Sequence, residues 1–133
     1  MLQKILFVCV ENACRSQMAE AFAHIHGQDC LQAYSAGSRP SGKVNEQAIR
    51  SMKAAGYDLS QHVSKALDNL PETRYDLVVT MGCGDTCPFV HATERRDWNI
   101  PDPKDMDMQH FNEVRDMIEQ NVFDLLEELN CSI

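Results

Sequence analysis

The sequence has no apolar run of about 18 residues, which is the length that a helix needs to span a membrane. Its first residues also lack the apolar core and the small-residue cleavage site of a signal peptide. We therefore expect a cytoplasmic protein with no membrane partner. Clusters of lysine and arginine are missing too, and the formal net charge is −8. Because phosphate contacts need clustered basic residues, we expect no nucleic-acid partner.

Repeats, linkers and low-complexity segments are also absent, and the 133 residues suit one hydrophobic core. We predict a single domain over residues 1–133 that acts as a monomer. The five histidines show no spacing typical of metal ligands, and neither a metal nor a cofactor is expected. Cysteine, in contrast, is abundant, with six residues. A structural disulfide framework is not expected in a reducing compartment, so this abundance points to redox or metal chemistry.

Segments typical of strands and helices alternate along the chain. Apolar runs predict buried strands at residues 5–8 and 75–81, and further strands are expected at 31–36 and 95–99. Apolar residues at helical spacing predict helices over 16–26, from a cap at Asn45 to about residue 55, and from 107 or 108 to 130. A short helix is also expected within 64–70. This alternation predicts an α/β fold with a parallel sheet that is covered by helices on both faces.

The most informative stretch runs from Cys9 to Ser16, between a predicted strand and a predicted helix. The backbone N–H groups of such a loop can form an anion-binding nest, and the following helix adds the positive end of its dipole. Arg15 can hold two oxygens of an oxyanion, and the positive surroundings favour the nucleophilic thiolate of Cys9. Ser16 can hydrogen-bond this sulfur and cap the helix. The pattern predicts attack of a thiolate on a tetrahedral oxyanion, and the simpler alternative is a buried cysteine before an ordinary helix.

Two more loops carry residues that bear on this hypothesis. Ligands of parallel sheets bind beyond the carboxyl ends of the strands, where the loops after the predicted strands converge. One of these loops holds Cys83 and Cys87, and another holds Asp102 before Pro103. Glycines flank Cys83 and would allow that loop to move.

Together these motifs resemble a known family over essentially the whole chain. The chain resembles the low-molecular-weight protein tyrosine phosphatase fold in several motifs. These are Cys9 with Arg15 and Ser16, the segments 14–20 and 34–37, and Asp97-Trp98 ahead of Asp102-Pro103. Within that fold they are similar to the thioredoxin-coupled arsenate reductases. The resemblance implies a three-layer α/β fold whose central sheet has four parallel strands flanked by helices. It also implies that Cys9 is the nucleophile, that Arg15 clamps the oxyanion and that Asp102 is the general acid. Asn12 would hold the shape of the loop. The oxyanion would be bound by the loop residues Asn12, Ala13, Cys14, Arg15 and Ser16.

The two branches of this family differ in how the Cys9 adduct is resolved. A phosphatase lets water hydrolyse a phosphocysteine, whereas reduction of arsenate to arsenite requires thiols to supply two electrons. Cys83 and Cys87 lie where the resemblance places those thiols, so Cys83 would attack the Cys9 adduct and Cys87 would resolve the resulting disulfide. A thioredoxin-like protein would recycle the enzyme. The residues after Pro103 are not aromatic, so no platform for a phosphotyrosine ring is expected, and we predict an arsenate reductase with residual phosphatase activity.

Several alternatives stay open at this point. The first is a low-molecular-weight protein tyrosine phosphatase that acts through phosphocysteine, and another is a non-catalytic oxyanion or metal sensor. Zinc could be held by four thiols, those of Cys9, Cys14, Cys83 and Cys87. Apart from that, Cys14 is interpreted as a packed loop residue that could exchange with Cys9, and Cys30 and Cys131 as structural bystanders.

Two departures from the family pattern concern charge. Glu11 stands where many relatives have glycine, and a carboxylate beside an anion site weakens binding unless it points outward. Some relatives bind a structural potassium ion through oxygens that match Asn12, Glu20 and Ser35, together with an aspartate. Lys65 stands at the position of that aspartate, so its ammonium could replace the ion.

Overall fold

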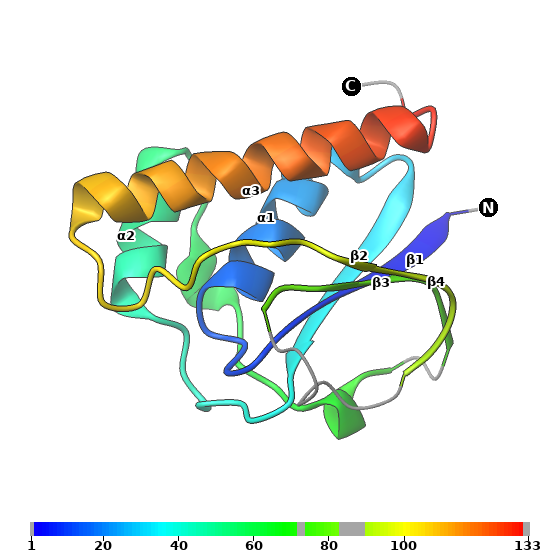
Figure 1. Ribbon diagram of the computed structural model, residues 1–133, viewed down its shortest axis with the longest axis horizontal. Coiled ribbons are helices and arrows are strands. Elements are labelled where there is room, and N and C mark those ends of the chain that lie inside the picture. Colours follow the sequence, from blue (N-terminus) through cyan, green and yellow to red (C-terminus); the bar gives the residue numbers. More distant parts are fainter. Residues whose placement is uncertain (1, 72–73, 83–89, 132–133) are drawn as a thin grey trace.

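Four parallel strands form the centre of the molecule (Figure 1). The computed structural model describes residues 2–71, 74–82 and 90–131. The strand order is β2-β1-β3-β4, and the strands are β1 (Gln3–Cys9), β2 (Leu31–Gly37), β3 (Arg74–Thr80) and β4 (His91–Asp97). The predicted four-stranded parallel sheet is therefore confirmed, because every neighbouring pair runs in the same direction.

Three α-helices lie on the same side of this sheet in Figure 1. They are α1 (Arg15–Gly27), α2 (Glu46–Ala54) and α3 (Met108–Glu128). Alternate residues of β1 point to opposite faces, as in any strand. Ile5 and Phe7 are buried among side chains of the α-helices, whereas Leu6 and Val8 belong to a second cluster on the other face. In the described part of the chain, that second face is covered by loop residues and the 3-10 helix η2 (Leu67–Asn69) rather than by an α-helix. The expected cover of both faces by helices is therefore wrong for the described residues, apart from this short 3-10 helix.

Local sequence signals account for where the helices begin and how they pack. The side chain of Asn45 accepts hydrogen bonds from the first turn of α2, as the sequence predicts. Asp107 does the same for α3, where its carboxylate accepts the N–H of His110. The apolar stripe predicted for α3 is confirmed, because the following side chains are buried: Phe111, Val114, Ile118, Val122 and Leu125. Within the described residues, no helix combines the length and apolarity that a membrane span requires.

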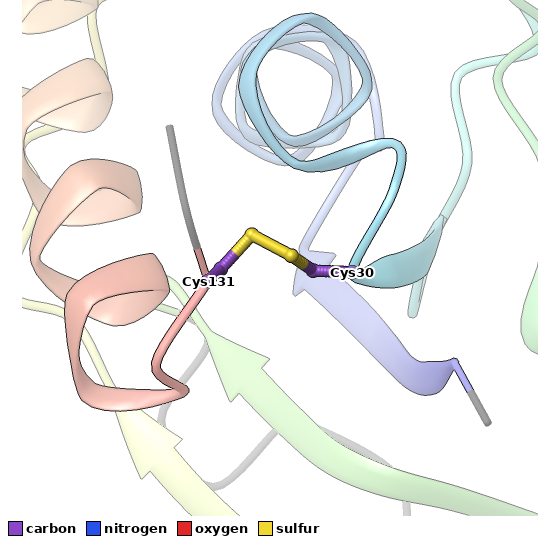
Figure 2. The surroundings of a disulfide bond; sticks show 2 residues. All are labelled: Cys30 and Cys131. Carbon is purple, nitrogen blue, oxygen red and sulfur yellow. A yellow bond between two sulfur atoms is a disulfide. The ribbon is translucent and has the colours of Figure 1, made fainter.

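A disulfide bond joins Cys30, just before β2, to Cys131, just after α3 (Figure 2). The two Cα atoms are 5.8 Å apart, within the usual range for a disulfide. The interpretation of these cysteines as bystanders is therefore wrong, and the expectation that the cysteines form no structural disulfide does not hold for this pair. The two cysteines meet because the chain brings the end of α3 back to the start of β2, although they are 101 positions apart in the sequence. This bond lies at the amino-terminal edge of the sheet, opposite to the strand ends that carry Cys9 and Asp97.

Candidate active site

The loop between β1 and α1 turns tightly at the carboxyl end of the central strand. Asn12 has a φ of 53°, in the left-handed region that asparagine tolerates better than most residues. Backbone N–H groups of segment 38–45 bind the loop carbonyls on one side, namely those of Cys9, Val10, Glu11 and Ala13. In a trans peptide the C=O and the next N–H point in opposite directions. The N–H groups that follow these carbonyls are therefore directed away from that segment, as an anion-binding loop requires.

Gly37 makes this close approach of the loop to β2 feasible. A Cβ atom at this position would lie 2.6 Å from the carbonyl oxygen of Val10 and 2.9 Å from the nitrogen of Asn12. Neither contact is tolerable for two backbone atoms, so only glycine fits. The segment 34–37, which the sequence singled out by resemblance alone, thus has a physical role in seating the loop.

The thiol of Cys9 is buried inside this loop and contacts the side chain of Ser16. Its Sγ atom lies 2.9 Å from Ser16 Oγ, which in turn accepts a hydrogen bond of 2.7 Å from Asn12 Nδ2. Because the serine hydroxyl already accepts from asparagine, its own hydrogen is free to be donated to the sulfur. The expected contact between Ser16 and Cys9 is present. The expected capping role is wrong, since α1 begins at Arg15 with Cys14 as its N-cap residue and without a side-chain cap.

Arg15 extends from the first turn of α1 to the loop that carries Asp102. Its side chain is 9% exposed, Nη1 donates to the carbonyl oxygen of Ile100 at 3.0 Å, and Nη2 lies 3.8 Å from Asp102 Oδ2. Gly82 packs against the guanidinium, because a Cβ atom there would lie 2.5 Å from Arg15 Nη1. The expectation that Gly82 and Gly84 allow the Cys83 loop to move stays a prediction, and the structure shows a further role for Gly82, which is to leave room for Arg15.

The segment with Asp102 is held in place by the residues just before it. The N–H of Trp98 donates to Thr80 at the end of β3, and its ring lies 5.7 Å from that of Phe7 between centroids. Ile100 is buried, and Asp102 beyond it has a half-exposed carboxylate. A carboxyl group that is fixed near the arginine and open to solvent is suited to proton transfer.

These groups line one pocket of about 480 Å³. Cys9, Cys14, Arg15 and Asp102 share its wall with residues from the segment that leads into α2. The pocket lies at the carboxyl ends of the strands, where parallel α/β sheets bind ligands. Its lining thus brings together the predicted nucleophile, clamp and acid.

Cys14 differs from Cys9 in its chemistry. Burial, assisted by the nearby charge of Asp102, raises the pKa of the Cys14 thiol from 9.0 to about 12. A thiol with such a pKa is protonated at neutral pH and is neither a good attacking group nor a ready zinc ligand. This favours the interpretation of Cys14 as a packed loop residue.

The carboxylate of Glu11 forms an ion pair with Lys104. Lys104 Nζ lies 2.8 Å and 2.9 Å from its two carboxylate oxygens. The hydrogen bond to Glu11 raises the pKa of Lys104 above its ordinary value. The charge that departs from the family pattern is therefore compensated by a residue 93 positions further along the chain.

Lys65 lies among the oxygens that match the potassium ligands of some relatives. Its Nζ is 3.3 Å from Ser35 Oγ, 3.3 Å from the Val63 carbonyl and 3.7 Å from Glu20 Oε1. The hypothesis that an ammonium stands where relatives hold the ion agrees with this placement. These residues do not fit a potassium ion, since the lysine side chain already fills the space between the oxygens.

A buried polar network, which the sequence did not predict, holds the side chain of Asn12 in the loop. The Asn12 Oδ1 atom accepts from Gln17 Nε2 at 2.8 Å, and Gln17 Oε1 contacts His62 Nδ1 at 2.8 Å. His62 Nε2 in turn lies 2.6 Å from the Tyr57 hydroxyl. Burial lowers the pKa of His62 below its ordinary value, although Glu20 opposes this shift. No local sequence spacing indicated the network, because His62 is 45 positions from Gln17.

Cys83 and Cys87 fall outside the residues that the structure describes. Their predicted positions near Cys9 and their roles therefore stay predictions.

Comparison with known proteins places this site in a family. Residues 4–132 match the model of the low molecular weight phosphotyrosine protein phosphatase family. The chain belongs to this family, as the sequence motifs predicted.

Within the family, similar proteins carry a more specific name. The chain is 40% identical over 118 residues to arsenate reductase 1 of Staphylococcus epidermidis, covering 86% of this chain and 88% of that one. A solved arsenate reductase in the phosphate-binding state superimposes with a TM-score of 0.86 at 34% identity, covering 96% and 99% of the two chains. A thioredoxin-dependent arsenate reductase of Corynebacterium glutamicum matches with a TM-score of 0.77 at 30% identity, covering 97% of this chain and 62% of that one.

Proposed function

We propose that this protein is an arsenate reductase in which Cys9 is the nucleophile. One observation carries the proposal: Cys9, Arg15 and Asp102 line the same pocket in a chain whose relatives are named arsenate reductases. Together these groups supply a nucleophile, a cation that stabilises the developing negative charge and an acid for the leaving group, which suits substitution at a tetrahedral oxyanion.

In the first step arsenate binds in the loop, and Arg15 holds two of its oxygens. The sulfur of Cys9 forms a bond to arsenic while one arsenic–oxygen bond breaks. Asp102 gives its proton to the departing oxygen, which leaves as water. No electrons are transferred to arsenic in this step, so it is the same substitution that a phosphatase performs on a phosphate ester.

The second step makes the reaction a reduction. The thiolate of Cys83 attacks the sulfur of Cys9, the sulfur–arsenic bond breaks, and its electron pair stays with arsenic. Arsenic is thereby reduced from the +5 to the +3 state, arsenite leaves, and a Cys9–Cys83 disulfide is left. Attack of Cys87 on Cys83 moves the disulfide to these two residues and frees Cys9. A dithiol donor of the thioredoxin type then reduces the Cys83–Cys87 bond.

We place this cycle in the cytoplasm, where such donors are kept reduced.

Residual phosphatase activity is a second proposal with its own support. The phosphatase cycle needs only Cys9, Arg15 and Asp102, since water can resolve a phosphocysteine. All three line the pocket. Among the residues that the structure describes, the pocket lining contains no aromatic side chain for a phosphotyrosine ring, which favours small phosphate esters as substrates.

The test compares two reactions of the same purified protein. Arsenate-dependent NADPH consumption is measured with thioredoxin and thioredoxin reductase, and hydrolysis of para-nitrophenyl phosphate is measured separately. We expect sustained NADPH consumption with arsenate and only slow ester hydrolysis, and we expect Cys9→Ser to abolish both. Ester hydrolysis without arsenate reduction would instead identify a phosphatase. Reduction that persists in Cys9→Ser would refute the assignment of the nucleophile.

A further inference from the structure

An ion pair between Glu11 and Lys104 connects the anion loop with the segment that carries the candidate acid. Both carboxylate oxygens of Glu11 contact the ammonium of Lys104, at 2.8 Å and 2.9 Å. Both residues line the pocket that contains Cys9. The contact therefore joins two loops, one after β1 and one after β4, across the site.

Lys104 also contacts the candidate acid directly. Its backbone N–H donates to Asp102 Oδ1 at 3.1 Å. The other carboxylate oxygen of Asp102 faces Arg15 Nη2 at 3.8 Å. The side chain of Lys104 is thus fixed to the anion loop while its backbone orients the carboxylate of Asp102.

We propose that Lys104 is a positioning residue that, through its ion pair with Glu11, sets the place of Asp102 and cancels a negative charge at the oxyanion site. This inference deepens the proposed function and rests on it. An oxyanion that binds in the loop carries up to two negative charges, and an uncompensated Glu11 would repel it. A loosened Asp102 segment would deliver its proton less efficiently to a leaving group that needs it.

The ion pair suits a clean test because it contributes little to folding. Lys104 is 53% exposed and Glu11 33% exposed, and exposed pairs of this kind contribute little to stability. Variants at these positions are therefore expected to fold, which circular dichroism and the thermal unfolding midpoint will check.

The experiment has a charge arm and a proton-transfer arm. In the charge arm, the dissociation constant of inorganic phosphate is measured by calorimetry for the wild type, Lys104→Gln and Glu11→Gln. We expect about threefold to tenfold weaker binding for Lys104→Gln, tighter binding for Glu11→Gln, and smaller differences at high salt. The matched control is Lys53→Gln, which removes an exposed lysine that does not line the pocket and is expected to leave binding unchanged.

In the proton-transfer arm, kcat is compared for phenyl phosphate, a poor leaving group, and para-nitrophenyl phosphate, a good one. Both single variants should lose more activity on phenyl phosphate, since that ester depends more on the acid. The charge-exchanged double variant E11K/K104E should restore the wild-type ratio of the two rates, because it re-forms the ion pair.

Two results would overturn the inference. The first is phosphate binding that changes no more in Lys104→Gln than in Lys53→Gln. The second is a ratio of the two ester rates that stays at the wild-type value in both single variants. A ratio that is as strongly changed in E11K/K104E as in the single variants would overturn the inference in the same way. Failure of the proposed function is distinguishable, since it appears as a wild type that does not reduce arsenate in the thioredoxin-coupled assay. The calorimetric arm still tests the charge effect in that case.

Discussion

Breaking the Cys30–Cys131 disulfide should lower the free energy of unfolding without affecting the active site. The bond spans a sequence separation of 101 residues. In the chain-entropy model, closing a loop of about 100 residues restricts the unfolded chain by about 4.7 kcal/mol, which we take as the upper limit. Removal of a native disulfide from a small protein typically costs at least about 2 kcal/mol, so we expect a loss between about 2 kcal/mol and this upper limit.

The assay is urea unfolding of the oxidised wild type and of the double variant Cys30→Ser/Cys131→Ser, followed by tryptophan fluorescence. With a slope of about 2 kcal/mol per M for a small protein, the midpoint should fall by about 1 to 2 M. Mass spectrometry of a tryptic digest first verifies that the peptides with Cys30 and Cys131 are joined. The slope should change as well, because the unfolded chain becomes less restricted.

Activity provides the internal control for this prediction. The disulfide lies at the amino-terminal edge of the sheet, whereas the pocket lies at the carboxyl ends of the strands. Phosphate-ester hydrolysis at low urea should therefore be the same in both proteins. Coincident unfolding curves, with the bond verified in the wild type, would refute the view that it stabilises the fold. A large loss of ester hydrolysis in the double variant would refute its independence from the site.

Three other predictions concern the site and its support. Arg15→Lys keeps the charge but loses the planar two-pronged grip, so kcat for both arsenate reduction and ester hydrolysis should fall by about 10²–10³-fold; an unchanged kcat at saturating oxyanion would contradict the clamp. Gly82→Ala should cost activity in both assays while the protein stays folded, because the added Cβ would lie 2.5 Å from Arg15 Nη1, and wild-type rates would show that the guanidinium is not held there. Burial keeps the pKa of His62 in the folded protein below its ordinary value of 6.5, so between the folded and the unfolded pKa the unfolded chain binds more protons. The free energy of unfolding should therefore fall as the pH drops below about 6.5. Urea titrations at several pH values should show a weaker dependence in His62→Gln.

The sequence was sufficient for features that depend on local patterns. Buried strands need apolar runs, and a helix that packs with one face needs apolar residues at helical spacing. The runs at β1 and β3 and the stripe of α3 are all present. The cap at Asn45 depends on one side chain and the turn that follows it. The loop from Cys9 to Ser16 likewise combines its functional groups within eight positions, so spacing alone could predict how they meet.

Contacts between distant segments could not be predicted in this way. The Cys30–Cys131 bond and the Glu11–Lys104 pair join residues 101 and 93 positions apart, and only the path of the whole chain brings them together. The clustering of the α-helices on one face was also hidden, because strands of a parallel sheet are apolar on both sides. Ser16 was assigned a capping role because serine is common at that position, although its hydroxyl is engaged by Asn12 and Cys9 instead.

In the proposed reaction, electrons reach arsenic through a second thiol, and arsenite release by Cys83→Ser tests this step. Arsenite would be quantified by chromatography coupled to elemental detection after arsenate is added to the reduced protein, with ester hydrolysis measured on the same sample. We predict that Cys83→Ser releases no arsenite while it hydrolyses para-nitrophenyl phosphate at close to the wild-type rate, because water resolves phosphocysteine without a thiol. Arsenite release by Cys83→Ser at the wild-type rate would contradict the relay through Cys83.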